Sequence, residues 1–170
     1  MKTEAISAVE VISMHLNRHY EADQRADAVV EMLLENEISN WDFWPLLQIL
    51  WGGFEKIDHT MFVHAMGAEK RKSSWTPTAE WRLLPMEISI FRGQSLGKEV
   101  GLSWTTSFDA ALDYATRFGC LTNKTPVILE TKISKNAVAL VIDDCDQNEF
   151  VLWKAPQISD CAITPVPSIH

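Results

Sequence analysis

An arginine, a group of hydroxyls and a carboxylate in the second half of the chain carry the chemistry of an anion-binding and catalytic site. Arg92 ends a run in which Ile88 and Ile90 alternate with Ser89 and Phe91, the period of a half-buried strand. A guanidinium at a strand end offers a planar fork of donors to a phosphate or a carboxylate. The alternative is a structural arginine that pairs with an acidic neighbour.

The hydroxyls follow on a second short strand that leads into a helix. They are contributed by Ser103, Thr105, Thr106 and Ser107. Ser107 is placed to cap the helix, and Asp109 falls in the first turn, where negative charge is favoured. Gly93, after Arg92, lets the backbone come close to whatever the arginine holds. The helix carries an apolar stripe of Ala111, Leu112 and Ala115.

The carboxylate is Glu149, at the end of the acidic stretch 143–149 between two strands. The aspartates of that stretch read as a solvated loop, because it lacks the glycine and the ligand spacing of a calcium loop. Glu149 instead opens the strand 150–152, and a carboxylate fixed by a strand is better placed for chemistry than one on a loop.

Three short motifs occur in order: Phe91-Arg92-Gly93, Thr105-Thr106-Ser107 and Gln147-Asn148-Glu149. Together, over roughly residues 86–155, they resemble the arginine–serine–glutamate class of ADP-ribosyltransferases. That family has an aromatic-Arg-Gly first strand, a Ser-Thr-Ser motif before a helix, and Glu-x-Glu or Gln-x-Glu at a later strand. Thr105 stands where the family usually has serine; the alternative is a shifted register in which Ser103 takes that role. The compact size also resembles bacterial or phage-encoded effectors.

The resemblance implies a mono-ADP-ribosyltransferase that cleaves NAD between nicotinamide and ribose and transfers ADP-ribose to a macromolecular acceptor, most simply a protein. It assigns Glu149 to the ribose and its developing positive charge. It assigns Arg92 to a phosphate of NAD, Gly93 to the carboxamide of nicotinamide, and the hydroxyls of Ser103 and residues 105–107 to ordering the pocket. Gln147, two residues before the glutamate, goes with acceptors other than arginine.

Two other functions remain open. An NAD glycohydrolase would pass ADP-ribose to water. An inactive fold of this type would act as an inhibitor or regulator that binds a partner through the tryptophans between Trp41 and Trp81, since aromatic clusters also anchor interfaces.

Around these residues the sequence predicts one α+β domain over 1–170. Residues 1–72 form a helical segment, 73–85 an ordered connector, and 86–170 a β-rich NAD-binding core. The expected arrangement is a helical half packed on a mostly antiparallel split sheet of ADP-ribosyltransferase type, the type being an implication of the resemblance.

Hydrophobic periodicity sets the expected elements. Helices are predicted around residues 6–16, 24–35, 44–51 and 56–69, with Asp42 as the cap of the third and Gly52-Gly53 as its end. Further strands are predicted at 126–133, 137–142 and 149–153, with a closing edge strand at 161–166 marked by Pro165.

Composition narrows the function further. The net charge of −8 over 170 residues argues against non-specific nucleic-acid binding, and the basic Lys70-Arg71-Lys72 reads as a solvated turn. The sequence shows neither a membrane span nor a signal peptide, so a cytoplasmic protein with reduced cysteines is expected. His15 and His19 have helical spacing for a metal but no third ligand, so no metal is expected. The oligomeric state is left open.

Overall fold

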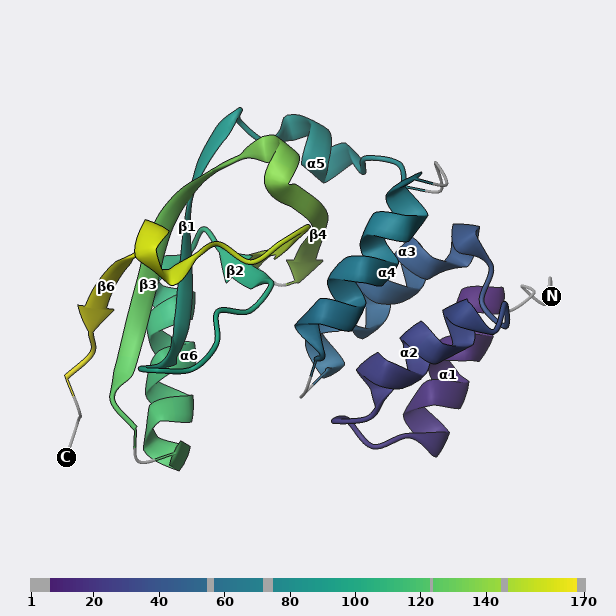
Figure 1. Cartoon of the computed structure of the whole chain (residues 1–170), viewed down its shortest axis with the longest axis horizontal. Coiled ribbons are helices and arrows are strands. Elements are labelled where there is room, and N and C mark those ends of the chain that lie inside the picture. The colour runs from purple at the N-terminus through teal and green to yellow at the C-terminus, as the bar shows by residue number, and fades with distance from the viewer. Residues whose placement is uncertain (1–6, 55–56, 72–74, 123, 145–146, 168–170) are drawn as a thin grey trace, which may run out of the picture. The chain divides into compact units, whose positions relative to one another are not determined.

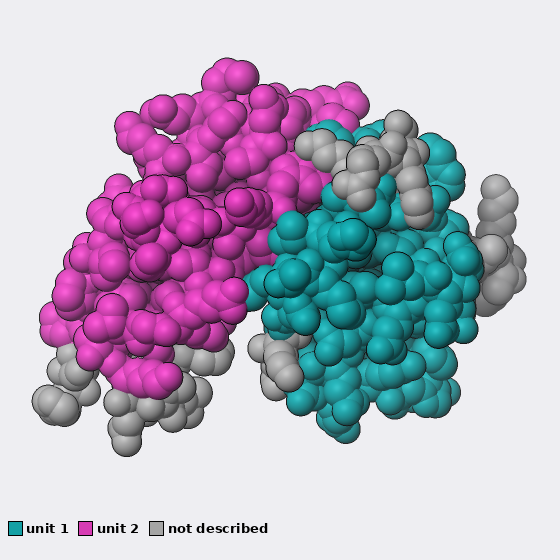
Figure 2. All heavy atoms as spheres, in the orientation of Figure 1, with its two compact units in different colours: residues 1–76 teal, residues 77–170 magenta. Residues whose placement is uncertain are grey.

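The computed structural model describes residues 7–54, 57–71, 75–122, 124–144 and 147–167; of residues 70–71, 118–122, 143–144 and 147–148 only the backbone is described. The chain divides into two compact units, residues 1–76 and 77–170 (Figure 2). The boundary lies inside the predicted connector. The first unit is helical and the second carries the sheet, so the α+β class is confirmed (Figure 1).

The first unit consists of short helices, as periodicity predicted. They are α1 (Ala8–His19), α2 (Arg25–Leu34), α3 (Asn40–Leu50), the 3₁₀ turn η1 (Trp51–Gly53) and α4 (His59–Arg71). Helix α1 starts with a capping box in which the Ser7 hydroxyl accepts from the backbone N–H of Glu10 and the Glu10 carboxylate accepts from that of Ser7. Its apolar face buries Leu16, and α3 contributes Phe43 and Leu47 to the same unit's core.

The predicted cap of α3 was wrong by three residues. Ser39, not Asp42, is the N-cap, and its hydroxyl accepts from the Asp42 N–H at 3.2 Å. Asp42 lies in the first turn of the helix, where the positive end of the helix dipole stabilises a carboxylate.

The second unit holds one six-stranded sheet in the order β4-β5-β2-β1-β3-β6, all of its pairs antiparallel. In chain order its elements are α5 (Ala79–Leu83), β1 (Glu87–Ser95), β2 (Ser103–Thr105), α6 (Phe108–Thr122), β3 (Pro126–Ser134), η2 (Lys135–Ala137), β4 (Val138–Asp144), β5 (Gln147–Leu152), η3 (Ile158–Asp160) and β6 (Ala162–Pro165). Strand β6 lies at an edge, as its proline predicted.

The sheet consists of two three-stranded halves that meet at one residue pair. Strands β4, β5 and β2 form one half, and β1, β3 and β6 form the other. Between the halves, β1 and β2 are in register only at Phe91 and Thr105. Beyond that pair the strands separate, and the chain from Ser95 to Leu102 connects them.

Side chains alternate between the two faces of this sheet, and each face has its own core. One face buries Ile90, Trp104 and Phe150, with Trp81 of α5 packed against them. Helix α6 covers the other face along β1 and β3, burying Ala111 and Ala115 beside Ile128 (Figure 1). The predicted apolar stripe of α6 is therefore confirmed.

The connector is ordered by its tryptophan. Trp81 on α5 donates its indole N–H to the backbone oxygen of Val138 at 3.0 Å, and Lys135 lies 4.5 Å above its ring. The indole N–H makes a hydrogen bond while the ring packs on apolar side chains of the sheet, so one tryptophan holds the segment in two ways.

Two predicted boundaries were wrong. Strand β1 does not end at Arg92 but continues to Ser95, which pairs with Pro126. The acidic stretch is mostly strand rather than loop, since Asp143 pairs with Asn148 and β5 begins at Gln147. Hydrophobic alternation misses both extensions because the added residues are polar or glycine, and their pairing is set by the neighbouring strand.

Candidate functional site

A hydroxyl and a carboxylate lie opposite each other on two neighbouring strands. Thr105 on β2 is in register with Glu149 on β5, and on its other side with Phe91 on β1. Partners across an antiparallel pair share a face of the sheet with Cβ atoms about 5 Å apart. The row Phe91–Thr105–Glu149 therefore crosses the middle of the sheet. Because Ser103 is in register with Val151 instead, Thr105 is the hydroxyl closer to the carboxylate.

Glu149 is the third residue of β5, not its first, and is half-buried. Pairing on both sides, with Thr105 and with Ile142, fixes its backbone in the sheet interior. Gln147, the predicted acceptor-selecting residue, has a side chain that lies outside the described part of the chain.

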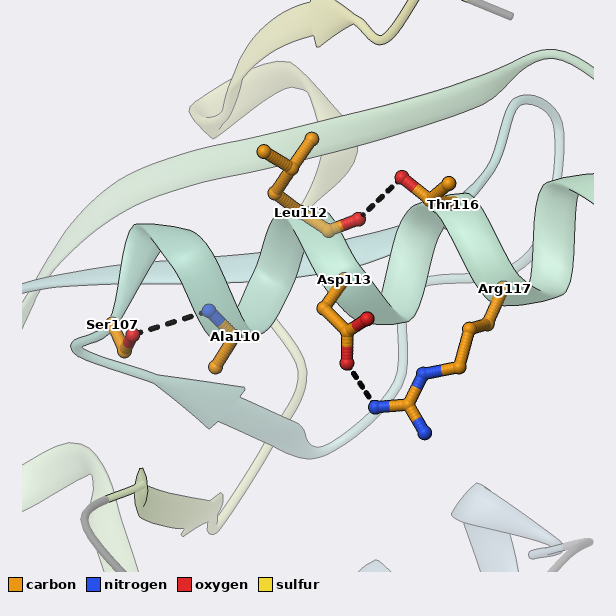
Figure 3. Close-up of polar contacts among 6 residues, drawn as sticks. All are labelled: Ser107, Ala110, Leu112, Asp113, Thr116 and Arg117. Carbon is orange, nitrogen blue, oxygen red and sulfur yellow. Dashed lines mark hydrogen bonds and ion pairs between the residues drawn. The ribbon is translucent and has the colours of Figure 1, made fainter. Parts of the chain in front are cut away.

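The hydroxyl motif builds the start of α6 (Figure 3). The Thr105 Oγ1 accepts from the backbone N–H of Ser107 at 3.0 Å, and the Ser107 Oγ accepts from that of Ala110 at 3.1 Å. The prediction that Ser107 caps the helix is confirmed. Thr106 is exposed on the bend between them. These bonds leave each hydroxyl's own proton available as a donor, since both oxygens are acceptors here.

Helix α6 carries two further polar contacts one turn along. The Thr116 hydroxyl donates to the Leu112 carbonyl at 2.8 Å, and Arg117 pairs with Asp113 (Figure 3). Both residues of that ion pair are exposed, so it contributes little to stability.

Arg92 lies where β1 and β2 separate. Because side chains alternate along a strand, Arg92 leaves β1 on the same face as Ile90 and Gln94, opposite to Phe91. Its Nη1 reaches β2 and donates to the Ser103 carbonyl at 2.6 Å, while Nε donates to the Gln94 Oε1 at 3.1 Å. Arg92 thus approaches the hydroxyl–carboxylate pair from the gap between the strands, not from the same face.

The chain between the strands packs closely around the guanidinium. A Cβ added to Gly101 would lie 2.6 Å from Nη2 of Arg92. Gly101 is held there by the indole of Trp104, which donates to its carbonyl at 3.0 Å. Trp104 is 2% exposed and belongs to the core.

The two acceptors that orient Arg92, the Ser103 carbonyl and the Gln94 amide oxygen, are neutral. Part of the residue stays accessible, yet burial lowers the pKa of the guanidinium; nearby Tyr114 and Glu149 act in the opposite direction. A buried cation is costly without a counter-charge. Glu149 supplies nearby negative charge that favours the charged guanidinium. A guanidinium can in addition hold a phosphate or carboxylate through its fork of donors.

Gly93 has a packing role. A Cβ at this position would lie 2.0 Å from the backbone oxygen of Ala111 and 2.6 Å from the nitrogen of Ala115. The sequence predicted that Gly93 brings the backbone close to the ligand of Arg92, whereas the close approach in the structure is to the backbone of α6.

Sequence patterns missed Gln94, whose side chain contacts Arg92. Gln94 is 2% exposed, and its Nε2 donates to the backbone oxygen of Lys98 at 2.9 Å. The spacing in the sequence could have indicated this contact, because residues 92 and 94 of one strand lie on the same face of the sheet.

The other features lie apart from this site. A cavity of about 300 Å³ is lined by Glu10, Ser13, Met14 and Ile49 of the first unit. Within the described residues, no cluster of histidine, cysteine and acidic side chains could hold a metal ion, and none of the helices there has the length and apolarity to span a membrane.

Comparison with known proteins returns no match: no family model fits the chain, and neither a curated protein nor a solved structure is similar to it. Function must be inferred from side-chain chemistry and geometry.

Proposed function

We propose that this chain is a mono-ADP-ribosyltransferase that uses NAD as substrate and transfers ADP-ribose to a macromolecular acceptor other than arginine. The observation that carries this assignment is the register of Thr105 with Glu149, next to Arg92 at the separation of β1 and β2. Arg92 and Glu149, 57 positions apart in the chain, thereby lie on β1 and β5, the two strands that pair with β2.

The sheet architecture supports the same assignment. Two antiparallel halves joined through the single pair Phe91–Thr105 fit the split sheet that the resemblance to ADP-ribosyltransferases implies. A cation and a carboxylate, Arg92 and Glu149, flank that pair and interact electrostatically.

The two charges suit opposite ends of the reacting half of NAD. Arg92 would bind a phosphate through its guanidinium fork. In the reaction the bond between ribose C1′ and the nicotinamide nitrogen breaks, and nicotinamide leaves with the electron pair. The acceptor's nucleophile then bonds to C1′ and loses its proton. Glu149 would stabilise the positive charge that develops on the ribose, where a fixed carboxylate has its largest effect.

The acceptor is inferred from Gln147. In the family that the motifs resemble, glutamine two residues before the catalytic glutamate accompanies acceptors other than arginine. We therefore expect labelling of protein side chains such as asparagine.

Substituting Glu149 tests the assignment directly. Glu149→Gln should abolish ADP-ribose transfer from labelled NAD to a cell lysate while leaving NAD affinity nearly unchanged, because the charge is needed mainly in the transition state. Glu130→Gln is the matched control. Glu130 is an exposed carboxylate on β3 and pairs with Phe91 of β1, so it lies in the same cross-strand row as Glu149. Equal turnover by Glu149→Gln and wild type would refute the role of Glu149.

Substituting Arg92 tests the phosphate contact. Arg92→Lys keeps the charge but loses the fork, and should weaken NAD binding in calorimetry; an unchanged dissociation constant would place the phosphates elsewhere. Thermal unfolding of the variant controls for its bonds to Ser103 and Gln94.

The same assay separates the alternative functions. Release of nicotinamide without labelling of any macromolecule would identify an NAD glycohydrolase. No release and no thermal stabilisation by excess NAD would identify an inactive binding fold, because a ligand that binds only the folded state must stabilise it.

A further inference from the structure

A second cation is held close to Arg92. Lys98 is an exposed residue of the segment between β1 and β2. Partial desolvation of its ammonium lowers the pKa of Lys98, and the positive charges of Arg92 and Lys124 lower it further. Lys98 thus lies near two other cations in a chain whose net charge is −8. Such a concentration of like charge is unfavourable in the free protein and is relieved when an anion binds.

Gln94 fixes the position of Lys98 relative to Arg92. Its buried amide uses both ends: Oε1 accepts from Nε of Arg92 at 3.1 Å, and Nε2 donates to the Lys98 carbonyl at 2.9 Å. Gln94 therefore connects the guanidinium to the backbone that carries the lysine.

The turn itself is closely defined. The Lys98 N–H donates to the Ser95 carbonyl at 3.1 Å, and Gly97 supplies the positive φ of 79° that such a turn requires. The Leu96 N–H donates to the Thr125 carbonyl at 2.8 Å, which places the turn beside Lys124. Both backbone groups of Lys98 are thus engaged, and only its side chain is free to move.

We propose that Lys98 is a second phosphate ligand, which acts with Arg92 on a diphosphate, and that Gln94 sets the spacing between the two cations. Arg92 binds one phosphate through its fork, and the more mobile ammonium of Lys98 binds the next as a point charge. This inference rests on the proposed function: it names the diphosphate of a dinucleotide as the part of the substrate that this turn recognises.

Calorimetry with ADP, AMP and inorganic pyrophosphate tests the inference on the full chain. We expect Lys98→Ala to weaken ADP and pyrophosphate binding about tenfold, the size of one charge-assisted contact. AMP affinity should change by less than about threefold, because Arg92 alone then holds its phosphate. Lys98→Arg should restore most of the ADP affinity. The matched control is Lys132→Ala, which removes an exposed lysine of β3 that pairs with Glu87 of β1.

Gln94 has its own test. Gln94→Leu, which is apolar and of similar size, should reduce the preference for ADP over AMP toward that of Lys98→Ala at temperatures where thermal unfolding shows it folded. A merely structural role would lower stability but leave the ADP/AMP ratio unchanged.

The outcomes separate this inference from the proposed function. If Lys98→Ala binds ADP like the wild type, or if the wild type binds neither ADP nor pyrophosphate, Lys98 is not a diphosphate ligand, whether or not nicotinamide is released. If ADP binding depends on Lys98 but NAD is not cleaved, the diphosphate site stands and the transferase assignment fails.

Discussion

At the scale of single residues, the environment of Arg92 decides how the site is interpreted. Arg92 donates to the carbonyl of Ser103 and to the amide oxygen of Gln94, and Glu149 is near enough to favour its charged form. Neutral acceptors hold the guanidinium in place, and the proposed function assigns its charge to a phosphate of the substrate.

Gly101 provides a prediction at this scale. Gly101→Ala should displace the guanidinium, because the new Cβ would lie 2.6 Å from Nη2 and 2.9 Å from Cζ. We expect a loss of about 1–3 kcal/mol in the free energy of unfolding in urea, together with weaker ADP binding. Gly52→Ala is the control, since a Cβ there meets nothing within 4 Å. Equal ADP affinity in Gly101→Ala and wild type would show that Arg92 does not bind the phosphate.

At the scale of elements, the contact of α6 with β1 depends on Gly93. Gly93→Ala would set a Cβ 2.0 Å from the Ala111 carbonyl, which is backbone and cannot rotate away. The helix must shift off the strand, so we expect the free energy of unfolding to fall by about 3 kcal/mol or more. Urea unfolding measures the loss. The exposed Ser89→Ala on the same strand should change little, and similar values for both variants would contradict this packing.

The start of α1 gives a prediction in pH. The backbone and hydroxyl of Ser7 bind the Glu10 carboxylate and lower its pKa below 4.5. A lowered pKa in the folded state means that ionised Glu10 stabilises the protein above pH 4.5 and that this contribution is lost as the pH falls through the folded-state pKa. The difference in melting temperature between wild type and Glu10→Gln should therefore shrink on acidification. A constant difference from pH 7 to about pH 3 would show that the capping carboxylate plays no part.

At the scale of the molecule, the two compact units carry separate hydrophobic cores. Residues 77–170 contain both faces of the sheet, with Trp104 buried on one and α6 on the other. A fragment of these residues should therefore unfold cooperatively, with coincident transitions in tryptophan fluorescence and circular dichroism. A gradual, probe-dependent transition would show that the sheet needs residues 1–76 to fold.

The sequence predicted the local structure well and the boundaries less well. The helical first half, the Ser107 cap, the apolar stripe of α6 and the edge strand with Pro165 all follow from periodicity and capping, which involve residues close in the chain. The Asp42 cap and the end of β1 at Arg92 were wrong. At the helix start Ser39 and Asp42 are both good caps, whereas the end of β1 is set by pairing with β3, which lies more than thirty residues along the chain.

The chain's own amino acids determined which segments are helices and strands and which side chains carry chemistry, because those properties arise from hydrogen bonds and periodicity within a few residues. Only the tertiary structure decided that Thr105, and not Ser103, lies opposite Glu149. It also decided that Gln94 connects Arg92 to Lys98 and that Gly93 faces α6. Strand register joins residues distant in the chain, and it is fixed by the packing of the whole sheet.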